Sequence, residues 1–180
     1  MENILYIQND IAISKFNDTE DKFFVAGYAC HYHTPNLNNE IVDANSFSKF
    51  FEMRNAGQIS TKLNYQHNME NLIGAVDEIT SLSDGLYITA HLNKGVKLCD
   101  ETLIPNIVCG DLNSFSTEGF VLDGYDGIVE NKDGTYYVKD FILTGVALVT
   151  TPADYNAKFS IKNYMQNKPT KPVKHIYWFL

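Results

Sequence analysis

Asp84-Gly85 separates two runs in which apolar and polar residues alternate, residues 73–80 and residues 86–92. Alternation with a period of two is typical of a β-strand, because successive side chains point to opposite faces. An Asp-Gly pair between two such runs is a strong hairpin signal, since both residues tolerate the backbone of a tight turn. The centre of the chain is therefore predicted to be a β-hairpin.

Other segments extend the strand pattern. Residues 23–33 alternate in the same way, and residues 114–122 read as a further strand. A second turn signal, Asp133-Gly134, precedes residues 135–150, which are rich in β-branched and aromatic side chains. This composition predicts a second hairpin that returns as one long strand.

Two segments show helical spacing. In residues 43–53, Phe47, Phe50 and Phe51 lie three and four residues apart and so share one side of a helix. A helix is also expected over residues 96–109, with a break or bend at Pro105. The expected fold is a strand-rich α+β domain of about seven strands with two or three helices.

The bulk composition excludes several classes of protein. A chain of 180 residues that is 44% hydrophobic suits one domain with its own core. Its formal charge of −8 is a poor match for nucleic acid or anionic lipid. The three cysteines, Cys30, Cys99 and Cys109, form no short metal-binding pair, and no signal peptide or membrane span is visible. We expect a soluble intracellular protein.

His67 is the histidine best placed for catalysis. It ends the short run LNYQH (residues 63–67) and precedes a polar loop, where a strand delivers a side chain to the rim of a site. An imidazole can accept a hydroxyl proton near neutral pH, although a hydrogen-bonded loop histidine is the commoner case. His31 and His33 share one strand face, but no third ligand accompanies them, so no metal and no cofactor are expected.

Ser116 lies in the segment SFSTEGF (residues 114–120), close to Gly119. A nearby glycine allows backbone amides to approach a substrate carbonyl, as an oxyanion hole requires. Ser114 is a rival nucleophile, because a shift of two residues keeps it on the same strand face. Without further context, this segment also fits an ordinary edge strand.

Four segments in the same order resemble the prohead serine protease family of tailed bacteriophages. The best match is LNYQHN (63–68) followed by IGAV (73–76) and DGLYITA (84–90), which is similar to the family's histidine loop and hairpin. The others are AGYA (26–29) with NEIV (39–42) and SF (46–47), then FSTEGF (115–120), and finally LTGVALV (143–149) with TPA (151–153). The resemblance spans about residues 20–160.

The resemblance implies an assemblin-like open β-barrel over residues 1–162, with residues 163–180 as a tail. It further implies a peptidase with Ser116 as nucleophile and His67 as general base. The implied substrates are scaffold or major capsid protein extensions, and the protease itself. The implied location is the immature capsid in the host cytoplasm, with the protease as a homo-oligomer.

One position departs from the family pattern. Many members have a Glu, and the assemblins a His, where this chain has Gly145. That side chain orients the catalytic imidazole, so the third catalytic member must come from elsewhere or be missing. Candidates are Asp140, Glu118 and Asp77, each of which also fits an ordinary surface carboxylate.

Two other functions stay open on the sequence alone. The first is a structural or scaffolding protein of the same fold that has lost its activity, for which Gly145 is the best argument. The second is an unrelated ligand-binding β-barrel, which predicts a closed apolar pocket and no Ser–His pair at its rim. The arrangement of Ser116 and His67 separates these alternatives from the peptidase.

Overall fold

The structure is a computed structural model that describes residues 13–14 and 21–157. Within these residues, one sheet has seven strands in the order β1-β2-β6-β5-β4-β10-β7. The strands are β1 Ile13–Ser14, β2 Lys22–His31, β4 Lys62–Tyr65, β5 Asn68–Ser81, β6 Gly85–Asn93, β7 Ser114–Val121 and β10 Phe141–Val149. The neighbours pair antiparallel except β4 and β10, which are parallel.

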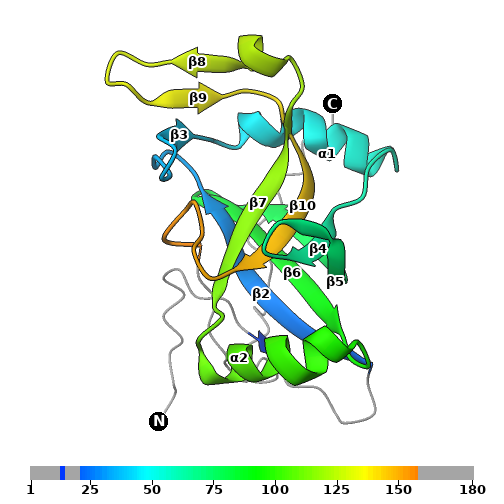
Figure 1. The fold of residues 1–180 in the computed structure, drawn as a ribbon. Helices are drawn as coiled ribbons and strands as arrows, with labels where there is room; N and C mark the ends of the chain where they lie inside the picture. The colour runs from blue at the N-terminus through cyan, green and yellow to red at the C-terminus, as the bar shows by residue number, and fades with distance from the viewer. Residues whose placement is uncertain (1–12, 15–20, 158–180) are drawn as a thin grey trace, which may run out of the picture.

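The sheet curls so that strands far apart in its order approach each other. Strands β2 and β7 contact one another although four strands separate them in the sheet (Figure 1). The core fills the concave side and includes Val25, Ile88, Phe115 and Val146, all fully buried. Because β7 pairs with β10 alone among the described strands, the curled sheet is an open barrel, and the strand-rich α+β prediction is confirmed.

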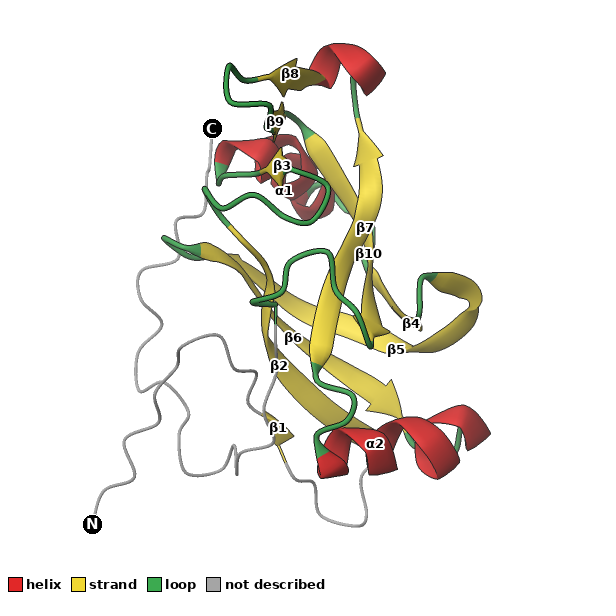
Figure 2. Ribbon diagram, turned by 60° about the vertical axis from the view of Figure 1, so that its left-hand side comes forward, coloured by secondary structure: helices red, strands yellow, loops and turns green. Residues whose placement is uncertain are grey.

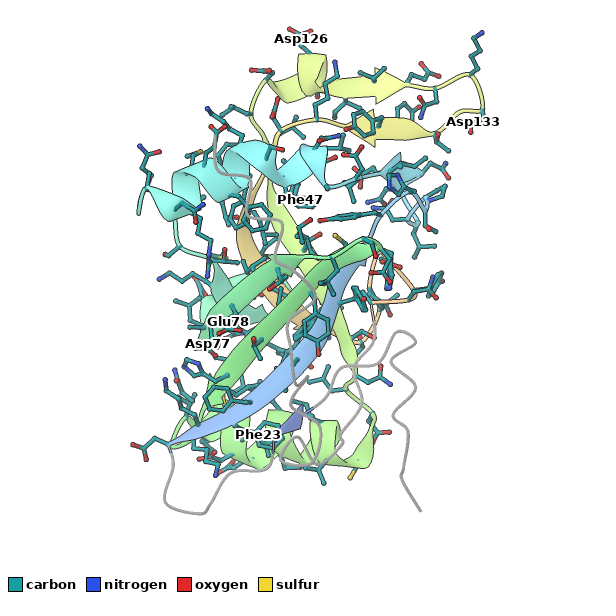
Figure 3. The ribbon with its side chains drawn as sticks, turned by 180° about the vertical axis from the view of Figure 1, so that it is seen from behind. Phe23, Phe47, Asp77, Glu78, Asp126 and Asp133 are labelled. Atoms are coloured by element: carbon teal, nitrogen blue, oxygen red, sulfur yellow. The ribbon has the colours of Figure 1, made fainter. Side chains whose placement is uncertain are left out.

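Helices cover the two ends of the sheet (Figure 2). At one end lie the 3-10 turn η1 Asn45–Phe47 and helix α1 Ser48–Asn55, where Phe47 and Phe50 are buried. Figure 3 shows Phe47 between α1 and the sheet. The aromatic spacing thus predicted the buried side correctly, and the helix begins two residues later than expected, at Asn45.

At the other end, the helical segment changes geometry just before its proline. A π-turn, η2 Cys99–Leu103, leads into α2 Ile104–Cys109, with Pro105 in the first turn of α2. Proline has no N–H and its ring clashes with the carbonyl four residues earlier. A wider π-turn at that point avoids the clash, so the expected disruption at Pro105 takes this form.

The predicted strand over residues 135–150 is wrong as a single element. It divides into β9 Tyr136–Val138 and β10, separated at Asp140, whose φ is +43°. Strand β9 joins β3 Glu40–Ile41 and β8 Ile128–Glu130 in a separate three-stranded sheet. The short 3-10 helix η3 Gly124–Gly127 precedes β8. Asp133 lies at the tip of the hairpin that β8 and β9 form (Figure 3).

No helix in the described ranges is both long and apolar enough to cross a membrane.

Candidate active site

Strand β7 presents Ser116 and Glu118 on one face, because residues two apart in a strand point the same way. Phe115 points to the opposite face and is buried in the core. Ser116 is only 6% exposed, whereas Glu118 is partly exposed. The core residue therefore fixes the strand, and the two polar residues face away from the core.

The register of the sheet brings Asn64 onto the same face. Ser116 opposes Ala147 on β10, and Ala147 in turn opposes Asn64 on β4. One step along, Glu118 opposes Gly145. Directly opposed residues in neighbouring strands point to one face, so the side chains of Ser116, Glu118 and Asn64 project from the same surface across three strands.

His67 lies in the two-residue turn between β4 and β5. Gln66 and His67 both have φ of +56°, which is the pattern of a type I′ hairpin turn. The Gln66 N–H donates to the Leu148 carbonyl (3.0 Å), and its side-chain amide donates to Thr150 Oγ1 (3.2 Å). These bonds fix the turn to the end of β10, so that the imidazole lies over the polar face of β7.

The imidazole of His67 pairs with Glu118. Its Nδ1 lies 2.9 Å from Glu118 Oε2, and the two side chains are 44% and 16% exposed. The other carboxylate oxygen, Oε1, accepts a hydrogen bond from Asn64 Nδ2. A carboxylate on Nδ1 favours the tautomer whose proton is on Nδ1, which leaves Nε2 free to accept a proton.

Gly145 provides the space that Glu118 occupies. A Cβ placed on Gly145 would collide with the Glu118 carboxylate oxygen and would lie 2.8 Å from both Cγ and Cδ. A β-bulge lies here too: the register shifts between Leu143 and Gly145 and leaves Thr144 as the extra residue. Bulges redirect side chains near functional sites. The missing acid at position 145 is thus matched by a carboxylate from the neighbouring strand.

Ser116, His67 and Glu118 line one cavity of about 290 Å³. Within the described part of the chain, Ser116 makes no hydrogen bond with His67, whose ring bonds to Glu118 instead. The cavity is lined by polar as well as apolar residues from β7, β2 and the loops after β2 and β10. A polar groove with a serine and a histidine on its wall contradicts a closed apolar ligand pocket.

The other predicted candidates lie elsewhere. Ser114 is 2% exposed, bonds to Asn113 and does not line the cavity. Asp77 lies on β5 and bonds to His91 through both carboxylate oxygens (2.8 Å each); Figure 3 labels it in the view from behind. Asp140 lies at the break between β9 and β10. Of the three proposed acids, only Glu118 contacts His67.

A second histidine–carboxylate pair also lines the cavity and was missed by the sequence analysis. His31 Nδ1 lies 2.8 Å from Asp154 Oδ2, and the same oxygen accepts the His31 backbone N–H (2.7 Å). The side chain of His31 is only 11% exposed, and its Nε2 is buried without a partner among the described residues. Among the described residues no hydroxyl group bonds to this nitrogen, and the pair fastens the loop after β10 to β2.

The cavity also contains the thiol of Cys30. Burial raises the pKa of this thiol to about 12, despite a hydrogen bond from the Leu86 backbone that lowers it. A thiol with such a pKa is not a nucleophile near neutral pH. Among the described residues, no three His, Cys, Asp or Glu side chains lie together as metal ligands. The chemistry that this cavity can perform therefore rests on its hydroxyl, imidazole and carboxylate.

Several solved structures match this chain. The bacteriophage T4 capsid assembly protease matches with a TM-score of 0.56 at 16% identity, over 79% of this chain and 98% of that one. KSHV protease, in complex with a hexapeptide phosphonate inhibitor, matches with a TM-score of 0.49 at 13% identity, over 75% and 62% of the two chains. Varicella-zoster virus protease matches with a TM-score of 0.42 at 15% identity, over 74% and 60%.

At 16% identity, the match to the T4 protease shows the fold alone. Comparison with curated protein sequences gives no match. The family model of the caudovirus prohead serine protease matches residues 10–171, which is most of the chain and includes every residue of the cavity described above. The chain therefore belongs to the caudovirus prohead serine protease family.

Proposed function

We propose that the chain is a serine endopeptidase in which Ser116 is the nucleophile, His67 the general base and Glu118 the residue that orients His67. The observation that supports this most is the contact of 2.9 Å between His67 Nδ1 and Glu118 Oε2, on the face of the sheet that presents Ser116. Glu118 thus takes the role of the third catalytic residue, which Gly145 cannot fill because it has no side chain.

The mechanism follows from the free ring nitrogen. His67 Nε2 takes the proton of Ser116 Oγ as this oxygen forms a bond to the scissile carbonyl carbon. The protonated ring then gives the proton to the leaving amine as the C–N bond breaks, which leaves an acyl-enzyme ester. Water, activated by the same nitrogen, hydrolyses the ester and regenerates Ser116.

Glu118 has two tasks in this scheme. It holds the proton of His67 on Nδ1, and its charge stabilises the imidazolium that forms in each step. The Ser116–His67 contact is expected to close when a substrate enters, because catalytic hydrogen bonds often shorten only in the complex. Backbone amides near Ser116 and Gly119 are the candidates for the oxyanion hole, on the strand that ends the sheet.

The family and the fold suggest the biological setting. We propose that the substrates are extensions of the major capsid protein and the scaffold protein, and that the chain also cleaves itself. Cleavage would take place inside the immature capsid in the host cytoplasm, with the protease as a homo-oligomer. The formal charge of −8 is a poor match for nucleic acid, so nucleic acid is not proposed as a partner.

The alternative is a structural capsid-assembly protein of the same fold without activity. Its main argument is that Gly145 removes the expected orienting acid. The Glu118 carboxylate weakens this argument, because it occupies that space and bonds to His67. The peptidase is therefore the function that the site supports best.

Intact-mass spectrometry after co-expression with the neighbouring capsid and scaffold proteins tests the proposal. Wild type should give defined cleavage products, and these should disappear in Ser116→Ala and in His67→Ala. Ser114→Ala is the matched control, since this serine lies outside the cavity, and its products should equal those of wild type. Cleavage that survives Ser116→Ala, or stable assembly without any cleavage, would contradict the proposal.

A further inference from the structure

We propose that Asn64 is a positioning residue for the peptidase site: it anchors the Glu118 carboxylate in the place from which that carboxylate orients His67. The inference rests on the proposed function and adds to it a residue of the LNYQHN segment to which the sequence alone gave no role. Asn64 has no hydrogen bond to Ser116 or His67 among the described residues, and its effect is expected to pass through Glu118.

The Glu118 carboxylate forms a bridge between two side chains. Oε1 accepts a hydrogen bond from Asn64 Nδ2, and Oε2 lies 2.9 Å from His67 Nδ1. Asn64 is fully buried on β4, whereas the His67 side chain is 44% exposed on a turn. The amide is therefore the fixed end of the bridge. Without it, the carboxylate of a flexible Glu side chain would be held only by the exposed ring that it has to orient.

The amide of Asn64 is itself only partly satisfied. Its Nδ2 donates to Glu118 and lies 3.4 Å from Met69 Sδ. Its Oδ1 is buried and accepts no hydrogen bond from the described part of the chain. A buried polar atom without a partner costs stability, and such costs concentrate at functional sites. An apolar residue at this position would avoid the cost, so the donor group is the feature that explains the asparagine.

Gly145 makes the contact between the two strands possible. Strand β10 lies between β7 and β4, so the Glu118 side chain must cross β10 to reach Asn64. It crosses at Gly145, where even a Cβ would collide with the carboxylate. Gly145 thus leaves the space through which Glu118 reaches Asn64, and the contact needs all three residues.

A double-mutant cycle tests the inference, with a peptide that spans a cleavage site found by co-expression. Asn64→Ala should lower kcat by about 10- to 100-fold, the range expected for losing a charge-assisted hydrogen bond, with KM nearly unchanged. In the Glu118→Gln background, the same substitution should lower kcat less than about threefold, because the charge on which Asn64 acts is already gone.

Thr61→Val is the matched control. Thr61 is 3% exposed, precedes β4 and donates its hydroxyl to the Leu143 carbonyl, so it is a buried polar link of the same strands that does not contact Glu118. It should leave kcat unchanged, even where the loss of its hydroxyl lowers the unfolding temperature. Equal losses of kcat in both backgrounds of the cycle, or an equal loss in Thr61→Val, would overturn the inference.

The outcomes also separate this inference from the proposed function. If Ser116→Ala is inactive while Glu118→Gln keeps full activity, the nucleophile stands and the role of Asn64 is refuted. If Ser116→Ala keeps full activity, the site itself is wrong and the role of Asn64 fails with it.

Discussion

At the scale of single residues, the carboxylate beside His67 comes from β7 and not from position 145 on the neighbouring strand β10. The family pattern places the orienting side chain on the strand that here contains Gly145, whereas this chain offers the carboxylate of Glu118 from the nucleophile strand. Because the two residues are opposed in the sheet, a carboxylate from one can fill the space left by the other. In this chain the group that contacts His67 Nδ1 is the Glu118 carboxylate.

The unfolding free energy of Gly145→Ala tests whether the Glu118 side chain occupies the space beside Gly145. The added methyl group collides with Glu118, so the variant should lose about 1–3 kcal/mol of unfolding free energy, the usual cost of overpacking. In a Glu118→Ala background the collision is absent, and the same substitution should cost little. Urea unfolding of the four proteins measures both values. Equal costs in the two backgrounds would show that Glu118 does not occupy this space.

At the scale of elements, two of the loops that line the cavity are each fastened by specific hydrogen bonds. The β4–β5 turn is held by Gln66. The loop after β10 is held by Asp154, which accepts bonds from the His31 ring, the His31 N–H and the Asn156 N–H (2.7–2.9 Å). Burial alone would raise the pKa of Asp154, but these hydrogen bonds outweigh it and lower the pKa below its usual value.

Asp154→Asn should therefore destabilise the protein in a pH-dependent way. A lowered pKa in the folded state means that ionised Asp154 stabilises the fold above its unfolded pKa of about 3.9, and that this contribution disappears as the pH falls through the folded pKa. The variant should be less stable than wild type at pH 7, and the difference should shrink below about pH 4. Urea unfolding at pH 7 and pH 3 measures it.

Asp111→Asn is the control for this prediction, because Asp111 is exposed and its side chain makes no hydrogen bond within the described ranges. It should match wild type at both pH values. A constant difference between Asp154→Asn and wild type across the pH range would show that the carboxylate contributes by shape alone.

At the scale of the whole molecule, the sequence predicted the elements better than their assembly. The hairpin at Asp84-Gly85 is present as β5 and β6, because alternation and turn chemistry are local properties. The prediction of one strand over residues 135–150 was wrong, because the strand breaks at Asp140. This residue has a left-handed backbone, and no glycine stands there to indicate it in the sequence. The domain boundary proposed at residue 162 lies outside the described residues and stays a prediction.

In the site too, single residues were easier to predict from the sequence than the contacts between them. Ser116 and His67 were predicted from motifs, and Glu118 was one of three candidates that the sequence could not rank. Only the register of three strands shows that Glu118 crosses Gly145 and meets Asn64. The Glu118–Asn64 contact joins residues 54 positions apart, and no local pattern encodes it. Asn64 could have been suspected only as a polar residue in an otherwise strand-like run.

Covalent labelling of the purified full-length chain with a fluorophosphonate, followed by peptide mapping, tests the central claim most directly. An activated serine reacts with this probe, whereas ordinary serines do not. We predict a single adduct on Ser116, which fragment ions distinguish from Ser114, and its loss in His67→Ala. An adduct on Ser114, or labelling of Ser116 that persists at the full rate in His67→Ala, would contradict the account.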